Sequence, residues 1–125
     1  MTYTMASRTK SLSAMVKFYY QSIDREDIAA ALAFFSPNAV YRRPGYDALR
    51  GYGAISTFYH EERVITGGQH ELEAVIEDGN RIAVRGRFKG TLRSGESTSI
   101  RFADFWRFAG SLVVERDTYF YVAAV

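Results

Sequence analysis

The chain has 125 residues, of which 47% are hydrophobic and 15% aromatic, so it is long enough for one domain and too apolar to be disordered. Sixteen Lys and Arg against fourteen Asp and Glu leave a net charge of +2 without a basic block, which gives no indication of nucleic-acid binding. The lack of cysteine excludes disulfides and a cysteine nucleophile, and two histidines are too few for a histidine-rich metal site.

The same composition bears on the compartment and the ligand. No run approaches the roughly 20 apolar residues of a membrane span, and the first residues lack the apolar stretch of a secretory signal. We therefore expect a cytoplasmic protein, a single domain over residues 1–125, without a membrane, metal or cofactor. The aromatic content indicates either walls for a ring-bearing or extended apolar ligand or an ordinary aromatic core.

Helical periodicity dominates the first half of the chain. Apolar residues recur at three-and-four spacing over residues 11–27 and predict an amphipathic helix. A second helix is predicted over residues 24–36, with Pro37 just beyond its end. A short strand and a turn-rich stretch over residues 39–53 precede a third predicted helix over residues 53–65.

After the sequence TGGQ the pattern changes to alternation, which is typical of strands with one buried face. The predicted strands cover residues 70–78, 80–92, 97–108 and 112–122. Their connections are short and contain glycine, as in β-hairpins. The sequence therefore predicts an α+β domain in which three N-terminal helices pack on one face of a curved antiparallel sheet of four to five strands.

This order of elements, at this length, resembles the nuclear transport factor 2-like superfamily, which includes ketosteroid isomerases, SnoaL-like polyketide cyclases and limonene-epoxide-hydrolase-like enzymes. The resemblance covers residues 15–121 and rests on the segments FYYQSID, DIAAALAFFSPNAVYRRPG, LRGYGAISTFY and FADFWRFAGSLVVERDTYFY. It implies a cone-shaped fold whose cavity is lined by the concave face of the sheet and by inward helix positions. The fold hosts enzymes, binders and adaptors alike, so the chemistry depends on the residues.

Alternation places Asp104 on one face of its strand together with Phe102 and Trp106. The resemblance to ketosteroid isomerases implies that Asp104 and Tyr19 donate hydrogen bonds to a developing oxyanion. Because aromatic neighbours desolvate a carboxyl group, we expect a raised pKa for Asp104 and a neutral acid that donates a proton. Tyr20 exchanges roles with Tyr19 if the phase of the helix differs by one residue.

The sequence lacks an acid at the position of the isomerases' general base. The isomerases carry an acid before a proline on the short strand after the second helix, where this chain has Arg43, which cannot abstract a proton. Asp117 is a candidate, because alternation places it with Tyr119 and the segment ERDTYF resembles the acid-bearing last strand of the hydrolase-like and SnoaL-like enzymes. Glu62, on the third helix, is another. The simpler interpretations are a cross-strand ion pair for Asp117 and a solvated helix face for Glu62.

The third helix also brings Tyr59, which matches a tyrosine of the oxyanion network in some isomerases, and Arg63, which could pair with an interior acid. His60 is expected at the surface of that helix, and His70 is expected to be exposed at the start of a strand. The predicted substrate-binding side chains are Phe35, Arg43, Phe58, Tyr59, Arg63, Phe102, Trp106 and Tyr119.

These features favour a cofactor-free enzyme of natural-product metabolism that uses Asp104, Asp117, Tyr19 and Glu62 for acid–base chemistry on a hydrophobic, oxygenated, polyketide-like small molecule. Cyclisation, isomerisation, dehydration and epoxide opening need the same groups, so the sequence does not separate them. The alternatives are a non-catalytic ligand-binding or adaptor protein of the same fold and an association module that works through its sheet. The resemblance also implies a homodimer, paired through the outer sheet face.

Overall fold

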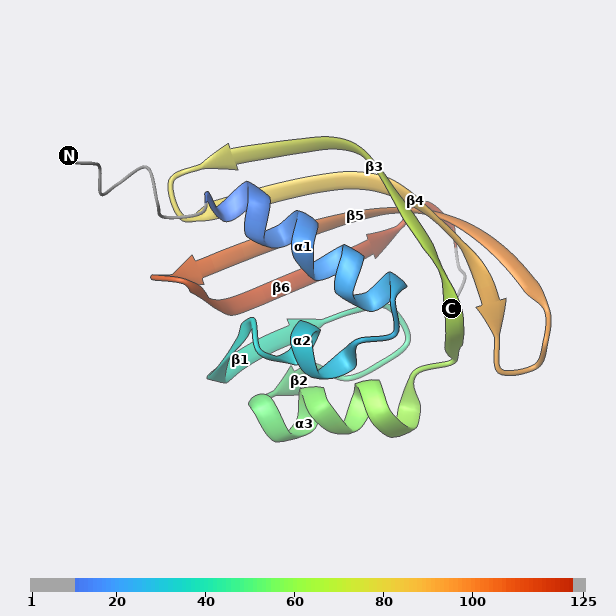
Figure 1. Ribbon diagram of the computed structural model, residues 1–125. Helices are drawn as coiled ribbons and strands as arrows, with labels where there is room; N and C mark the ends of the chain where they lie inside the picture. The colour runs from blue at the N-terminus through green and yellow to red at the C-terminus, as the bar shows by residue number, and fades with distance from the viewer. Residues whose placement is uncertain (1–10, 123–125) are drawn as a thin grey trace.

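In the computed structural model, which describes residues 11–122, helices lie on one side of a curved, open, six-stranded sheet (Figure 1). The helices are α1 (Leu12–Asp24), α2 (Ile28–Leu32) and α3 (Tyr52–Thr57), and α3 continues into a π-helical turn, η2 (Phe58–Glu62). The strands are β1 (Phe35–Arg42), β2 (Leu49–Arg50), β3 (Ile65–Asp78), β4 (Arg81–Leu92), β5 (Ser97–Ala109) and β6 (Leu112–Phe120). Within the described part of the chain, no helix is long and apolar enough to span a membrane. The N-terminal residues, which the sequence predicts to lack a secretory signal, lie largely outside the described residues.

Helix α1 is fixed by its cap and by its apolar stripe. The hydroxyl of Ser11 accepts a hydrogen bond from the backbone N–H of Ala14 at 3.0 Å, which satisfies one of the free donors at the helix start. The apolar side chains spaced by three and four residues all face the sheet and are buried: Val16, Tyr19, Tyr20 and Ile23. Two adjacent tyrosines therefore enter the core from one helix.

The second helix is shorter than the sequence predicts. Helix α2 ends at Leu32, and β1 begins at Phe35 instead of the helix continuing to residue 36. In the pairing of β1 with β6 the register shifts between Phe35 and Val40, and Pro37 lies in this irregular stretch. A proline has no N–H to contribute to a ladder, so a strand tolerates it at such a place.

The strand order is β2-β1-β6-β5-β4-β3, which gives more strands than the four or five predicted. All neighbours are antiparallel except β1 and β6, which run parallel, so the prediction of a purely antiparallel sheet is wrong at this pair. The whole β3–β5 meander lies between β1 and β6 in the chain. Since a parallel pair needs a long connection, this separation permits it.

Strands β3, β4 and β5 curve around the helices (Figure 1). Strand β3 begins at Ile65 and runs through the TGGQ segment that the sequence predicts as a break. Gly68 pairs with Gly90, and a Cβ on Gly90 would lie 2.2 Å from the carbonyl oxygen of Gly67. Only glycine permits such close backbone approach, which accommodates the strong curvature of this part of the sheet.

The core fills the space between the concave face of the sheet and the helices. The alternation predicted for β5 is confirmed, because every second side chain is buried: Ile100, Phe102, Asp104, Trp106 and Phe108. One member of this row is a carboxylate, and Asp104 is only 1% exposed. A buried carboxylate needs charge compensation and hydrogen bonds, which makes its surroundings the place to look for a site.

Candidate functional site

Asp104 accepts hydrogen bonds on both carboxylate oxygens. Arg116 donates from Nε to Oδ1 at 3.3 Å and from Nη2 to Oδ2 at 2.9 Å. The hydroxyl of Thr118 donates to Oδ1, and the hydroxyl of Tyr20 donates to Oδ2. The side chain of Arg116 is 6% exposed, so this is a buried ion pair in the two-pronged geometry in which arginine binds carboxylates best.

The register of β5 and β6 produces this contact. Asp104 lies directly opposite Thr118, and Trp106 lies directly opposite Arg116. Side chains that face each other, or that lie two residues further along the partner strand, are neighbours on one sheet face. Asp104 therefore meets a hydroxyl across the ladder and a guanidinium on the diagonal.

The ion pair decides the protonation state of Asp104. Burial alone would raise its pKa, but the charge of Arg116 and the hydrogen bonds from Arg116, Thr118 and Tyr20 outweigh burial and hold the pKa below its usual range. The prediction that Asp104 is a neutral proton donor is therefore wrong. The aromatic neighbours were identified correctly, but the effect of the adjacent cation is larger.

A group of tyrosine hydroxyls surrounds the other side of Arg116. Its Nη1 donates to the hydroxyl oxygens of Tyr19 at 2.6 Å and Tyr59 at 3.0 Å, and these two hydroxyls share a hydrogen bond. The indole Nε1 of Trp106 donates to the Tyr20 hydroxyl at 3.2 Å. Burial raises the pKa values of Tyr19 and Tyr20 well above the ordinary value, so both stay protonated. Both helix tyrosines thus belong to the network, on different partners.

Tyr41 and Arg43, at the end of β1, extend the network. Nη1 of Arg43 donates to the Tyr41 hydroxyl at 2.7 Å, and the hydroxyl groups of Thr118 and Tyr41 lie 3.4 Å apart. Burial would raise the pKa of Tyr41, but the charges of Arg116 and Arg43 outweigh burial, and the pKa is lowered. Tyr41 was not predicted as a site residue, although alternation along residues 39–43 places it on the face of Arg43.

A cavity of about 50 Å³, here called the inner cavity, adjoins this network. Its polar lining residues are Arg43, His70, Asp104, Arg116 and Thr118, and its apolar lining residues are Ile65, Phe88, Ile100, Phe102 and Phe120. Pockets that enclose drug-sized ligands measure about 300–1,000 Å³, so the inner cavity suits a small molecule or one end of a larger one.

His70 lies in the wall of the inner cavity, so the prediction that it is exposed is wrong. Its Nδ1 is 2.6 Å from Oδ1 of Asp24, the last residue of α1, and its backbone N–H donates to Oδ2 of Asp24 at 2.9 Å. An ionised carboxylate only accepts hydrogen bonds, so Nδ1 carries a proton, and in the neutral ring Nε2 is the acceptor. The ring packs against Tyr20, Phe88 and Phe102. The predicted strand begins at residue 70, whereas β3 begins at Ile65. The alternation that directs His70 inward already begins at Gly68, before the predicted strand.

Residues 16–116 match the SnoaL-like domain family over most of the chain. The chain belongs to this SnoaL-like family. No curated protein matches it in sequence.

Solved structures share the fold of this SnoaL-like chain. A nuclear transport factor 2-like protein of unknown function from Burkholderia pseudomallei is 24% identical, with a TM-score of 0.78 over 89% of this chain and 92% of that one. A limonene-epoxide-hydrolase-like epoxide hydrolase of Mycobacterium tuberculosis is 14% identical, with a TM-score of 0.76 over 87% and 81%. TerC, crystallised with polyporic acid, is 22% identical, with a TM-score of 0.74 over 88% and 92%. Similarity at these identities establishes the fold and not the activity.

Two predicted site residues of the SnoaL-like chain lie on the opposite sheet face. Asp117 accepts a hydrogen bond from Nη1 of Arg42 at 3.0 Å, and Tyr119 is 57% exposed. The prediction that they line the cavity with Asp104 is wrong, because the register of β5 and β6 shifts between Arg107 and Phe108. This irregularity moves the inward positions of β6 by one residue, as a β-bulge does.

The remaining predicted residues lie in the core or at the surface. Glu62 is exposed, so the prediction that it supplies a base in the cavity is wrong, whereas the surface position predicted for His60 is confirmed. Arg63 is buried with its guanidinium 6.0 Å from the ring centre of Tyr59, outside the lining of the inner cavity. Among residues 11–122, no three His, Asp or Glu side chains are placed to hold a metal ion. The predicted binding residues that instead pack in the core around the network are Phe35, Phe58, Tyr59 and Trp106.

Proposed function

We propose that this SnoaL-like protein is a cofactor-free acid–base enzyme. It acts in the inner cavity on a small hydrophobic and oxygenated molecule or on the reacting end of a larger one. The observation that carries this proposal is the His70–Asp24 pair in the wall of a cavity that also holds the Asp104–Arg116 ion pair. A base and a cationic wall in one apolar space form the minimum inventory for proton transfer next to an oxygen.

His70 is the proposed general base. The hydrogen bond from Nδ1 to Asp24 fixes the tautomer and the orientation of the ring, and Nε2 is then the atom that accepts a proton. An imidazole held by a carboxylate is a recurrent arrangement of enzymatic bases. Asp24 does not face the substrate and acts as a positioning residue.

The network around Asp104 has an electrostatic role in this proposal. Asp104 has four donors on its two oxygens and is no longer available as a base. It holds Arg116 in place, and the guanidinium stabilises an oxygen that gains negative charge. Groups fixed before the reaction stabilise charge more effectively than mobile ones, because they need not reorganise. Tyr19 and Tyr59 hold the arginine from the helix side, and Tyr20 holds Asp104.

The reaction class that suits these groups is proton abstraction from carbon next to a carbonyl, as in isomerisation or aldol-type cyclisation. The proton passes from the substrate carbon to Nε2 of His70, the enolate oxygen lies toward Arg116, and the proton returns at another position. No co-reactant is needed for an isomerisation of this kind. A polyketide-derived carbonyl compound of natural-product metabolism has the required functional groups.

The test is α-proton exchange of small cyclic ketones and enones in deuterated water, followed by proton NMR. His70→Gln is expected to lower the exchange rate by about 10²–10⁴-fold, because a positioned base contributes about that much. His60→Gln is the matched control, since His60 is the second histidine of the chain and lies at the surface. Equal exchange by the His70 variant and the parent, with both folded by circular dichroism, contradicts the assignment.

A binding protein without turnover is the second candidate. It is supported by the saturation of Asp104 and by the small volume of the inner cavity. The two functions are separated by the same series of ketones: ligands that bind to the parent protein without any exchange of α-protons favour the binder.

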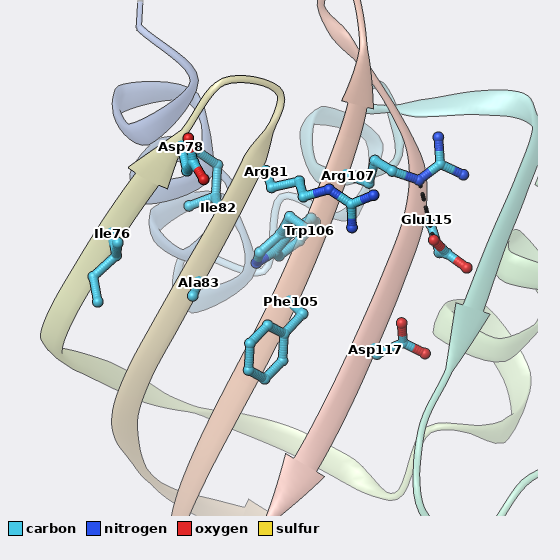
Figure 2. A pocket seen from close by; sticks show the side chains of 10 residues that line it. All are labelled: Ile76, Asp78, Arg81, Ile82, Ala83, Phe105, Trp106, Arg107, Glu115 and Asp117. Carbon is cyan, nitrogen blue, oxygen red and sulfur yellow. Dashed lines mark hydrogen bonds and ion pairs between the residues drawn. The ribbon is translucent and has the colours of Figure 1, made fainter.

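We also propose that the protein is a homodimer that pairs through the outer face of the sheet. Across neighbouring strands Ile76, Ala83 and Phe105 form a row on this face, and Figure 2 shows them beside Arg107 and Glu115. Ile76 and Phe105 are 63% and 51% exposed. Because the patch carries both cations and anions, it can be complementary to itself across a two-fold axis, which is the condition for an isologous interface.

A further inference from the structure

The inner cavity carries an uncompensated positive charge. Its lining contains two guanidinium groups, those of Arg43 and Arg116, and one carboxylate, that of Asp104. Asp104 is paired with Arg116. Among residues 11–122, no carboxylate lies within ion-pair distance of Arg43. The charge of Arg43 is therefore left over on one side of the cavity.

The surroundings of Arg43 offer rings and a single neutral hydroxyl. The centre of its guanidinium lies 4.8–5.8 Å from the ring centres of Tyr41, Tyr46, Phe58 and Phe120. Its Nη1 donates to the Tyr41 hydroxyl at 2.7 Å. Its Nε is buried and has no hydrogen-bond acceptor in the described part of the chain. A buried, charged donor without an acceptor is costly, so its retention points to a ligand that supplies the acceptor.

The neighbouring hydroxyl reports the same excess of positive charge. Burial would raise the pKa of Tyr41, but Arg116 and Arg43 together outweigh burial and lower it. Negative charge is therefore favoured at this end of the cavity. The walls next to it are apolar, with Ile100, Phe102 and Phe120 among the lining side chains, so they suit an unsaturated or aromatic body.

We propose that Arg43 binds a carboxylate of the ligand, so that the substrates of this protein are small, planar, unsaturated or aromatic carboxylic acids. The proposal rests on the proposed function and names its substrate class. With Nη1 taken by Tyr41, the Nε edge of the guanidinium faces the carboxylate, and planar guanidinium groups match carboxylates through two parallel hydrogen bonds. The ring contacts of Arg43 hold this edge in position before the ligand arrives.

The experiment measures binding of crotonate and benzoate, each beside its neutral amide, to the purified full chain. Isothermal titration calorimetry gives the affinity. The fluorescence of Trp106, the single tryptophan and a member of the network, reports occupancy. Both acids are expected to bind at least 10-fold more tightly than crotonamide and benzamide. Equal affinity for acid and amide, or no binding of either acid at millimolar concentration, overturns the proposal.

The variant Arg43→Gln keeps a polar side chain and removes the charge. It is expected to lower the affinity for both acids by about 10- to 100-fold, the range of a hydrogen bond to a charged group. Arg42→Gln is the matched control, because Arg42 is next in sequence and points to the outer sheet face, where it contacts Glu115 and Asp117. If Arg43→Gln binds the acids like the parent while folded by circular dichroism, the proposal is wrong.

Two further measurements separate this proposal from the proposed function. Arg43→Lys keeps the charge without the planar fork, so an affinity between those of the parent and of Arg43→Gln is expected. His60→Gln is expected to bind both acids within about 3-fold of the parent, because His60 lies at the surface and outside the lining of the inner cavity. Binding in the absence of any α-proton exchange sinks the enzymatic proposal alone, and exchange without preference for acids sinks the carboxylate proposal alone.

Discussion

A carboxylate inside an aromatic core stays ionised only where a cation and several donors replace the water it has lost. Asp104 has this environment, with Arg116 on both oxygens and two hydroxyl groups besides. Removing one partner leaves the other as an isolated buried charge. The core therefore tolerates both partners of the ion pair together but not either one alone, in contrast to the exposed pairs on the outer face.

We expect Arg116→Met to lower the free energy of unfolding by about 3–5 kcal/mol, the typical cost of breaking a buried ion pair. Urea denaturation gives the value. The control is Arg107→Met, because the side chain of Arg107 is 39% exposed and its pair with Glu115 spans 3.1 Å. An exposed pair of this kind contributes about 0–1 kcal/mol. Similar losses in the two variants would contradict the central position of Arg116.

The lowered pKa of Asp104 predicts a dependence of stability on pH. In the unfolded chain the carboxyl group has a pKa of about 3.9. Its pKa is lower in the folded protein, so the folded state binds fewer protons in the acid range. The stabilisation is complete above the unfolded pKa and is lost as the pH falls through the folded pKa. In this acid range we expect the unfolding free energy of the parent to decrease more steeply than that of Asp104→Asn.

The difference in slope between the two proteins isolates Asp104 from other acids, among them Glu115, whose pKa is lowered by hydrogen bonds from Arg42 and Arg107. One proton corresponds to at most about 1.4 kcal/mol per pH unit. Parallel curves for the parent and Asp104→Asn over this range would mean that Asp104 does not titrate in the folded protein as assigned.

At the scale of elements, alternation predicted β5 correctly and β6 incorrectly, for a reason that lies in the backbone. Strand β5 has one apolar face, so its pattern indicates which side is buried and places Asp104 inside. Strand β6 has polar residues on both faces around Arg116, and the register shift next to Phe108 changes its phase by one residue. No local pattern in the sequence marks that shift. Arg116 and its effect on Asp104 thus required the structure.

The paired glycines of β3 and β4 give a prediction at the same scale. A Cβ on Gly90 would lie 2.2 Å from the carbonyl oxygen of Gly67 and 2.5 Å from the ring of Phe88. We expect Gly90→Ala to lower the free energy of unfolding by about 1–3 kcal/mol, the usual cost of overpacking. For Gly67→Ala, where no atom lies within 4 Å of the added Cβ, we expect a change within about 0.5 kcal/mol. A larger loss in the Gly67 variant would contradict this account of the curvature.

Across the whole molecule, the two faces of the sheet carry different side chains. The concave face holds the network and the inner cavity, while the outer face exposes the apolar row of Ile76, Ala83 and Phe105 (Figure 2). The sequence could predict this difference between the two faces, because alternating strands covered by helices imply one buried and one solvent-facing side. The sequence could not assign Asp117 and Tyr119 to the open face, because the register shift between β5 and β6 is not visible in it.

The proposed dimer is tested on this open face. Phe105→Glu is expected to convert the dimer into a monomer, because it replaces the largest side chain of the apolar row by a charge. Light scattering at micromolar concentration gives the mass. Tyr52→Glu is the control, since Tyr52 is an exposed aromatic residue on α3, which packs against β1 and β2 and not on the strands of the apolar row. A parent protein that is monomeric under these conditions excludes the dimer.

The π-helical turn η2 has a consequence for how this site can change. Such a turn corresponds to one residue inserted into an ordinary helix, and it lies where Phe58 and Tyr59 are buried. Deleting one residue within η2 would restore α-helical spacing and turn the residues before the deletion by about 100° relative to those after it. Tyr59 would then rotate away from Arg116 while β3 kept its place in the sheet. A single-codon deletion would thus remove one of the two tyrosine hydroxyls that hold Nη1 of Arg116, while Tyr19 and Asp104 kept the arginine in place.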